Sequence, residues 1–131
     1  MLDCIEVAAG VVKNAEGRIL ICCRKVPMDG LWEFPGGKRE KCDTFQQTLE
    51  RELMEELELS VEANETLGSV LSNDGRSIWL VFVSARPRGS DAFVLHDHSH
   101  AAWVLPQDLP QYRFCPADQR FLDSYLPTLL Q

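Results

Sequence analysis

The chain has 131 residues, 45% of them hydrophobic and 25% charged, which is typical of one globular domain over residues 1–131 rather than a disordered chain. The net charge of −7 argues against binding to nucleic-acid polymers or anionic membranes, because either needs a basic face. No apolar run approaches the roughly 20 residues of a transmembrane helix. The five cysteines form no CxxC pair, so we expect reduced thiols in a cytoplasmic protein.

The first part of the chain alternates strands with turns. We expect, in chain order, a strand at 4–12, a turn at 14–17, a strand at 18–23, a chain break at 27–30, and a short extended segment at 31–34 that ends at Pro35-Gly36-Gly37. The glycine pair allows the backbone to approach a ligand closely, and a glycine-rich turn before a helix can present N–H donors to phosphate.

A helix is predicted over residues 44–57, because Phe45, Leu49, Leu53 and Leu57 recur every four residues, with Met54 beside them. Either Asp43 or Thr44 can cap it, since each is followed three residues later by a glutamine, as in a capping box.

The second part of the chain is predicted to form a hairpin, a loop, a strand and a final helix. The hairpin strands are 66–72 and 76–85 around Asn73-Asp74-Gly75, the loop is 86–91, the strand is 101–105, and Pro116 opens the last helix, whose apolar face holds Phe121, Leu122, Tyr125 and Leu126. Hairpins among helices indicate a mixed sheet covered by helices, an α/β fold.

Three acids of the predicted helix, Glu52, Glu55 and Glu56, fall within one sector of about 100° that borders the apolar stripe. Like charges at this spacing repel each other. A hard divalent cation bound by carboxylate oxygens would offset the repulsion. A solvated acidic face is the alternative on this helix alone.

Residues 37–59, GKREKCDTFQQTLERELMEELEL, resemble the Nudix box, G-x5-E-x7-R-E-U-x-E-E-x-G-U, in which U is a bulky apolar residue. Seven positions match at the correct spacing: Gly37, Arg51, Glu52, Leu53, Glu55, Glu56 and Leu59. Asp43 stands where the box has Glu, which leaves a shorter carboxylate. Glu58 stands where the box has Gly, and a left-handed helix end there would cost roughly 1 kcal/mol.

Weaker motifs outside the box resemble the branch of cytidine-triphosphate pyrophosphohydrolases, close to the MutT-type enzymes. They are the segment 31–38, Cys23-Arg24, His96-Asp97-His98 before Trp103, and Pro116-Ala117-Asp118. The resemblance implies a Nudix α/β/α sandwich with a mixed sheet. It also implies a nucleotide substrate, Mg²⁺ or Mn²⁺ as cofactor, no nucleic-acid polymer, no membrane, and a monomer or homodimer.

By the same resemblance, the catalytic residues are Glu52, Arg51 and Glu55, with Glu52 our choice to accept the proton of the attacking water. The metal ligands are Glu52, Glu55, Glu56 and, from a later loop, Asp97. The residues expected to bind substrate are Arg24, Phe34, Gly36, Gly37, Lys38, Arg76 and Asp118.

Alternatives remain open at several of these positions. Arg51 can instead form a surface pair with Glu55, Arg24 can form a solvent ion pair, and Phe34, like Trp32, can pack in the core. The run His96, His98 and His100 is expected at an exposed active-site rim, with a Zn or Ni site as the alternative.

Asp118 is the position most informative about specificity. An ionised carboxylate only accepts hydrogen bonds, so it favours a base edge with amino donors, such as the N4 amine of cytosine, and guanine also fits. The alternative is a cap on the last helix.

The activity expected is Mg²⁺-dependent hydrolysis of (deoxy)nucleoside triphosphates to monophosphate and pyrophosphate, with cytidine-type or modified bases preferred. The enzyme alternatives are an 8-oxo-dGTP diphosphatase or a broad-specificity Nudix enzyme. An inactive Nudix domain that senses a ligand is the alternative of another class, and the intact glutamate set argues against it.

Overall fold

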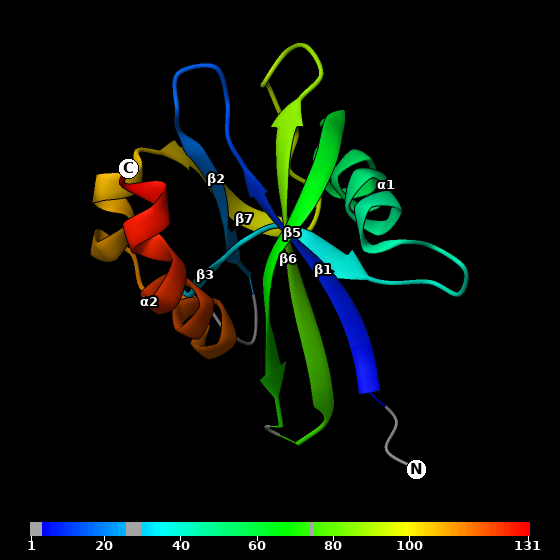
Figure 1. Cartoon of the computed structure of the whole chain (residues 1–131). Coiled ribbons are helices and arrows are strands. Elements are labelled where there is room, and N and C mark those ends of the chain that lie inside the picture. Colours follow the sequence, from blue (N-terminus) through cyan, green and yellow to red (C-terminus); the bar gives the residue numbers. More distant parts are fainter. Residues whose placement is uncertain (1–3, 26–29, 74) are drawn as a thin grey trace.

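The computed structural model describes residues 4–25, 30–73 and 75–131. In this part of the chain the strands form two sheets, and helices α1 (Phe45–Leu57) and α2 (Pro116–Leu129) lie on opposite sides of them (Figure 1). The predicted α/β fold, with helices covering a mixed sheet, is confirmed.

The larger sheet has four strands among the described residues, in the order β4 (Gly36–Lys38), β1 (Cys4–Val12), β6 (Ser77–Pro87) and β5 (Val61–Ser72). β1 runs parallel to β6 and antiparallel to β4, and β5 pairs antiparallel with β6. This is the mixed sheet that the sequence predicts, and β4 is an addition to it. The sequence did not predict this short glycine-rich strand, because the segment is a strand only through its pairing with β1.

The smaller sheet contains β3 (Trp32–Glu33), β2 (Ile19–Arg24) and β7 (His98–Val104), in that order within the described part of the chain. Its strands are all antiparallel. A bulge between Cys23 and Arg24 shifts the register of β2 against β7. This sheet places the end of β2 beside both β3 and β7.

Strand boundaries differ from the expected ones mainly by extension. β5 begins at Val61 rather than at 66, β6 continues to Pro87, into the expected loop, and β7 begins at His98 rather than at 101. Each added residue is placed in a strand by a neighbouring strand, which local composition does not reveal. The predicted break at 27–29 and the turn residue Asp74 lie outside the described residues.

Helix α1 forms as its periodicity predicts. Thr44 is the cap: its side chain accepts from the Gln47 amide, and the Gln47 side chain accepts from the Thr44 amide. Leu49, Leu53 and Leu57 are buried, and burial of each contributes roughly 1.5–3 kcal/mol. Met54, which was expected beside the apolar stripe, is 47% exposed. It follows Leu53 by about 100° around the helix and so turns toward solvent.

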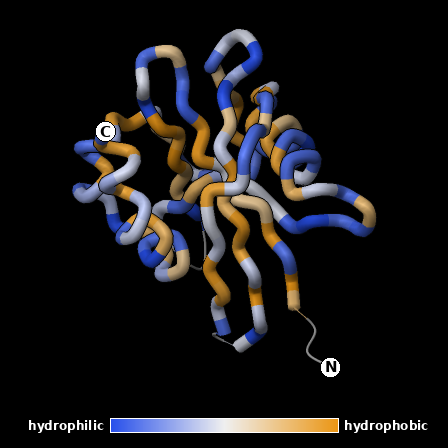
Figure 2. The backbone as a smooth tube through the Cα atoms, viewed as in Figure 1, coloured by the Kyte–Doolittle hydropathy of each residue, from blue (hydrophilic) through white to orange (hydrophobic). Residues whose placement is uncertain are grey.

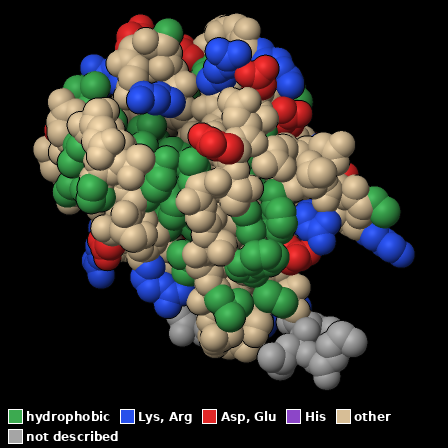
Figure 3. Space-filling model, in the orientation of Figure 1, with side chains coloured by type: hydrophobic (Ala, Val, Ile, Leu, Met, Phe, Trp, Pro, Cys, Tyr) green, Lys and Arg blue, Asp and Glu red, His purple; other side chains and the backbone are tan. Residues whose placement is uncertain are grey.

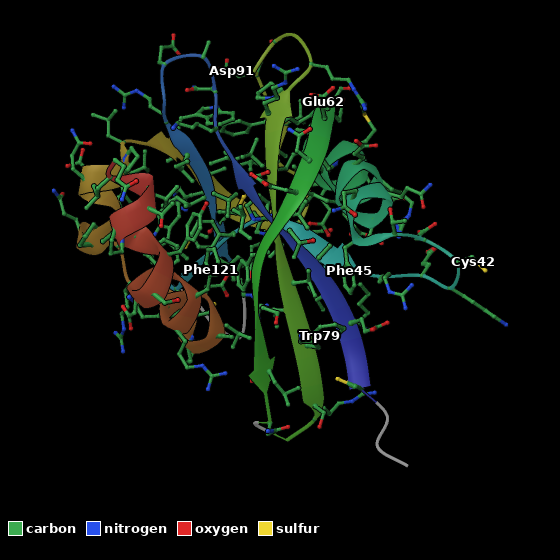
Figure 4. All side chains as sticks on the ribbon, viewed as in Figure 1. Cys42, Phe45, Glu62, Trp79, Asp91 and Phe121 are labelled. Atoms are coloured by element: carbon green, nitrogen blue, oxygen red, sulfur yellow. The ribbon has the colours of Figure 1, made fainter. Side chains whose placement is uncertain are left out.

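Two cores lie on the two sides of the larger sheet. The core under α1 contains Leu49, Leu53 and Val83, and the core under α2 contains Phe82 and Phe121, whose rings stack with centroids 3.9 Å apart. The strands that cross the middle of the molecule carry most of the hydrophobic colour, and the connecting loops are largely hydrophilic (Figure 2). Figure 4 shows Phe121 on the α2 side and Phe45 on the α1 side.

Helix α2 is preceded by a 3-10 helix, η1 (Pro106–Gln111), and begins with Pro116 in its first turn. Phe121 and Leu122 are buried beneath it, as the apolar face predicts. Cys115 occupies the cap position and makes no side-chain capping bond. The helix therefore begins without a carboxylate cap.

Hydrophobic side chains gather over the hairpin of β5 and β6 on the face that Figure 3 shows. Leu71 and Trp79 pair across this hairpin and are 52% and 37% exposed. In the described residues, no helix combines the length and apolar character needed to span a bilayer. All five cysteines are free thiols.

Candidate active site

A cavity of about 440 Å³ opens between the two sheets and reaches from α1 to the start of α2. Its apolar lining includes Ile5, Val7, Ile78 and Leu80, which are paired across β1 and β6. Phe34 adds an aromatic side chain at the α2 end. The cavity therefore offers a flat apolar surface bounded by charged groups.

The glycine pair lines this cavity, as expected, but for a different reason. A Cβ on Gly36 would collide with the Ala8 backbone, and a Cβ on Gly37 would collide with the Glu52 side chain. The glycines thus permit the pairing of β4 with β1 and the close approach of Glu52. They do not open the helix, since α1 begins only at Phe45.

Of the three glutamates on the acidic face of α1, Glu56 lines the cavity, and Glu52 lies against Gly37, which also lines it. Glu55 is not part of the lining. Glu52 and Glu56 are half-buried, whereas Glu55 is exposed, so the expected shelter holds for two of the three. Burial raises the pKa of Glu52 above its ordinary value, with Arg51 opposing and Glu55 adding to the rise. Burial raises the pKa of Glu56 to about 6, which His98 opposes and Glu52 reinforces.

Glu56 and Asp97 both line the cavity, although Asp97 lies on a different segment of the chain. No group of three His, Cys, Asp or Glu side chains among the described residues is close enough to hold a metal ion. The expected alternative of a Zn or Ni site therefore has no support here. Mg²⁺ is usually bound through only one or two carboxylates, with water and phosphate oxygens completing its shell, so the hard oxygen donors of this region fit it.

Arg51 contacts the acids around it and does not pair with Glu55. One terminal nitrogen, Nη2, lies 3.2 Å from Asp43 Oδ2, and the other, Nη1, lies 3.4 Å from Glu52 Oε2. The shorter carboxylate of Asp43 therefore still reaches Arg51. This arrangement fixes Glu52 from the side opposite Gly37.

Glu58 ends α1 in the left-handed conformation, with φ of 51°, as its place in the motif predicts. Its side chain contacts a later segment of the chain, since Glu58 Oε2 lies 2.8 Å from His96 Nε2. The amide of Val94 also donates to the Leu57 carbonyl at 2.8 Å. The end of α1 thereby contacts the segment that carries Asp97.

Arg24 ends β2 and lines the cavity, where it contacts Glu33 and, through Glu33, is linked to His98; the sequence did not predict these contacts. Arg24 Nε donates to Glu33 Oε1 at 2.7 Å, and His98 Nε2 lies 2.9 Å from Glu33 Oε2. Although burial opposes it, hydrogen bonds from His98 and Arg24 lower the pKa of Glu33. The bond to Glu33 raises the pKa of His98.

The expectation of an exposed histidine rim is wrong at one position. His96 and His100 are exposed, but His98 is buried within β7. The sequence does indicate a partner for Glu33, because the residue lies between Trp32 and Phe34. Burying an unpaired acid there would cost free energy. Nothing in the local sequence indicates which histidine is buried.

Asp118 is buried at 4% exposure and lines the cavity from the first turn of α2. Its Oδ1 accepts from the Phe34 amide at 3.1 Å. Burial raises the pKa of Asp118 to about 7, even though this hydrogen bond opposes the rise. The carboxyl is therefore partly protonated near neutral pH, which corrects the assumption that it is always ionised.

Some of the remaining residues expected at the site line the cavity, and others do not. Lys38 lines the cavity. Phe34 does too, while also stacking on Phe114 in the core at 5.3 Å between ring centroids. Trp32 packs edge-on against Tyr112 at 5.1 Å. Arg76 is exposed beside the hairpin turn and is not part of the cavity lining, although Ile78, two residues further along, is.

Comparison with known proteins gives a consistent result. The family described as NUDIX domain matches residues 5–125. The CTP pyrophosphohydrolase of Escherichia coli is 32% identical over 93% of this chain and 91% of that protein. The 8-oxo-dGTP diphosphatase of Proteus vulgaris is 41% identical over 50% of this chain and 61% of that protein. The solution structure of the E. coli ORF135 protein superposes with a TM-score of 0.81 at 32% identity, covering 96% of this chain and 91% of that one.

Proposed function

The chain belongs to the Nudix family and is a Nudix hydrolase, and from that premise we propose that it hydrolyses (deoxy)nucleoside triphosphates to nucleoside monophosphate and pyrophosphate with Mg²⁺. The observation that carries the proposal is one cavity that joins an apolar platform to cations and to Glu56 on the acidic face of α1. Cytidine-type or modified bases are the proposed preference, and the two relatives named for CTP and 8-oxo-dGTP support that substrate class.

The base is proposed to lie at the α2 end of the cavity. Val7, Leu80 and Phe34 supply apolar and aromatic surface for a planar ring. Asp118 lies beside them, and its ionised form accepts hydrogen bonds from the N4 amine of cytosine. Guanine also presents amino and N–H donors, which makes an oxidised guanine nucleotide the second candidate.

The polyphosphate is proposed to lie between the base and α1. Arg24, Lys25 and Lys38 line this part of the cavity and would balance phosphate charge. Arginine is suited to this because its planar guanidinium matches phosphate oxygens in pairs. Such local cations allow an anionic substrate despite the net charge of −7.

The acids are proposed to hold the metal and activate water. The ligands of Mg²⁺ are proposed to come from Glu52, Glu55, Glu56 and Asp97, with one or two of these carboxylates binding the ion directly. When bound, the ion would neutralise charge that spreads over the phosphate oxygens. Glu52 is the proposed acceptor of the proton from the attacking water, and its raised pKa suits a general base. Arg51 holds Glu52 in place through its guanidinium.

The remaining proposals concern the setting of the enzyme. The five free thiols favour a reducing compartment, and we place the protein in the cytoplasm. The proposed state is a monomer or homodimer that acts on free nucleotides and not on nucleic-acid polymers or membranes.

A nucleotide panel with Mg²⁺ tests the function directly. Pyrophosphate and phosphate are followed separately for dCTP, CTP, 5-methyl-dCTP, 8-oxo-dGTP, dGTP and dTTP, with Glu52→Gln as the inactive control. We expect pyrophosphate without free phosphate, and the highest kcat/KM for cytidine-type or oxidised guanine substrates. Phosphate as the only product would refute the cleavage position, and binding without turnover would favour the ligand-sensing alternative.

A further inference from the structure

The contacts of Arg24 extend through Glu33 to a buried histidine. Arg24 Nε donates to one carboxylate oxygen of Glu33 at 2.7 Å, and His98 Nε2 contacts the other at 2.9 Å. The three residues come from the three adjacent strands β2, β3 and β7. Each oxygen of Glu33 thus has its own nitrogen partner.

A bulge makes this contact possible. Cys22 pairs with Ala101 and Cys23 with His100, and regular pairing would next place Ser99 opposite Arg24. The register shift after Cys23 places His98 there instead. Because side chains alternate between the faces of a strand, this shift moves His98 to the face that carries Arg24.

Burial increases along the chain of contacts. The side chain of Arg24 is 46% exposed, that of Glu33 16% and that of His98 7%. A carboxylate only accepts hydrogen bonds, so Nε2 of His98 carries the proton and donates it. Glu33 is therefore fixed from the buried side and presents its other oxygen to Arg24.

The bond to Glu33 determines how the guanidinium of Arg24 is oriented. Among the described residues, Nε is the side-chain nitrogen of Arg24 that is hydrogen bonded, and the group lines the cavity. A bond at Nε sets the plane of the guanidinium, and its two terminal nitrogens remain for oxygen atoms of a ligand.

We propose that His98 is a positioning residue that, through Glu33, fixes the Arg24 guanidinium at the nucleotide cavity. The inference rests on the proposed function for its ligand, a nucleoside triphosphate. His98 itself does not need to touch the nucleotide. Its loss leaves Arg24 in place but free to rotate, which weakens nucleotide binding more than it slows chemistry.

Two substitutions of His98 separate the positioning role from simple packing. In His98→Gln, the amide nitrogen reaches about as far as Nε2 and still donates to Glu33. In His98→Asn, the amide is too short to reach. His100→Asn is the matched control, because His100 lies on the same strand, is exposed and is not part of the cavity.

Kinetics with the preferred nucleotide provide the first readout. We expect His98→Asn to raise KM at least about tenfold with kcat within about threefold of wild type, since orientation of a binding group is lost. His98→Gln and His100→Asn should stay within about threefold of wild type in both constants. In an Arg24→Lys background, which lacks Nε, His98→Asn should add less than about twofold to KM. Equal effects of His98→Asn in both backgrounds, or a fall in kcat alone, would overturn the proposal.

The NMR signal of the Arg24 Nε–H, recorded without nucleotide, provides a readout that does not depend on activity. We expect a slowly exchanging, shifted signal in wild type and His98→Gln, and its loss in His98→Asn. His98→Leu, which removes the donor to Glu33 and introduces no unpaired polar group at its own buried position, is the second variant if His98→Asn does not fold, and it should lose the signal too. An unchanged signal in the folded variant would overturn the proposal. If wild type hydrolyses no nucleotide, the proposed function fails, whereas this signal still decides whether His98 positions Arg24.

Discussion

The buried carboxyl of Asp118 makes the stability of this protein depend on pH, and Asp118→Asn exposes that dependence. The pKa of Asp118 is about 7 in the folded protein because burial disfavours its charge, against 3.8 as its ordinary value. The folded state therefore holds the proton more tightly than the unfolded chain. The resulting stabilisation is fully present below pH 3.8 and is lost as the pH rises through 7.

The size of the effect follows from the two pKa values. A tenfold difference in proton affinity corresponds to about 1.4 kcal/mol, so the interval from 3.8 to about 7 corresponds to roughly 4 kcal/mol at most. At pH 5 the unfolded carboxyl is already ionised, and the part lost between pH 5 and pH 8 is about 2–3 kcal/mol. The amide introduced by Asp118→Asn does not titrate, and its oxygen can still accept from the Phe34 amide.

Urea unfolding of wild type and Asp118→Asn at pH 5, 6, 7 and 8 measures the effect. We expect the free energy of unfolding of wild type, relative to the variant, to fall by about 2–3 kcal/mol over this range. Asp123→Asn is the control, since Asp123 is an exposed carboxylate on the same helix, and its difference from wild type should vary by less than about 0.5 kcal/mol. A difference between wild type and Asp118→Asn that does not change with pH would refute the reasoning.

Three further predictions follow from the site. Glu52→Gln and Glu56→Gln should each lower kcat at least about 100-fold at matched Mg²⁺ with the fold retained, and near-normal turnover in both would contradict the mechanism. Glu58→Gly should stabilise the protein by up to about 1 kcal/mol by relieving the left-handed backbone, and more in a His96→Ala background, where no ion pair is lost; a fall in melting temperature in both backgrounds would contradict this. At pH 8, Asp118→Asn should lower kcat/KM for dCTP relative to dTTP about tenfold or more, and an unchanged ratio would show that the base is read elsewhere.

The sequence predicts best the features that depend on neighbouring residues. The capping box of Thr44 and Gln47 and the four-residue spacing of Leu49, Leu53 and Leu57 both lie within one helix, and both form as expected. The left-handed end at Glu58 is likewise set by the chain around it. These features need no knowledge of the rest of the fold.

The features that the sequence did not reveal depend on contacts between distant segments. β4 is a strand because Gly36 and Gly37 can lie against Ala9 and Ala8, far away in the sequence. His98 is buried because a bulge places it opposite Arg24, and the same spacing without a bulge would expose it. Arg76 was expected at the site from its place just after the hairpin turn, and it is exposed there, two residues before Ile78 of the cavity lining.

The distribution of charge in the cavity gives the proposed metal a second role, in binding as well as in chemistry. Arg24, Lys25 and Lys38 attract a polyphosphate, whereas Glu56 and Asp97 line the same space and repel it. The attraction and repulsion act within one cavity of about 440 Å³, so a polyphosphate bound there experiences both. In the proposed mechanism a divalent cation lies between the phosphate and these acids, because an ion bound there would neutralise the adjacent anions more completely than water does. In this proposal the nucleotide and the cation therefore bind together, each completing the site for the other.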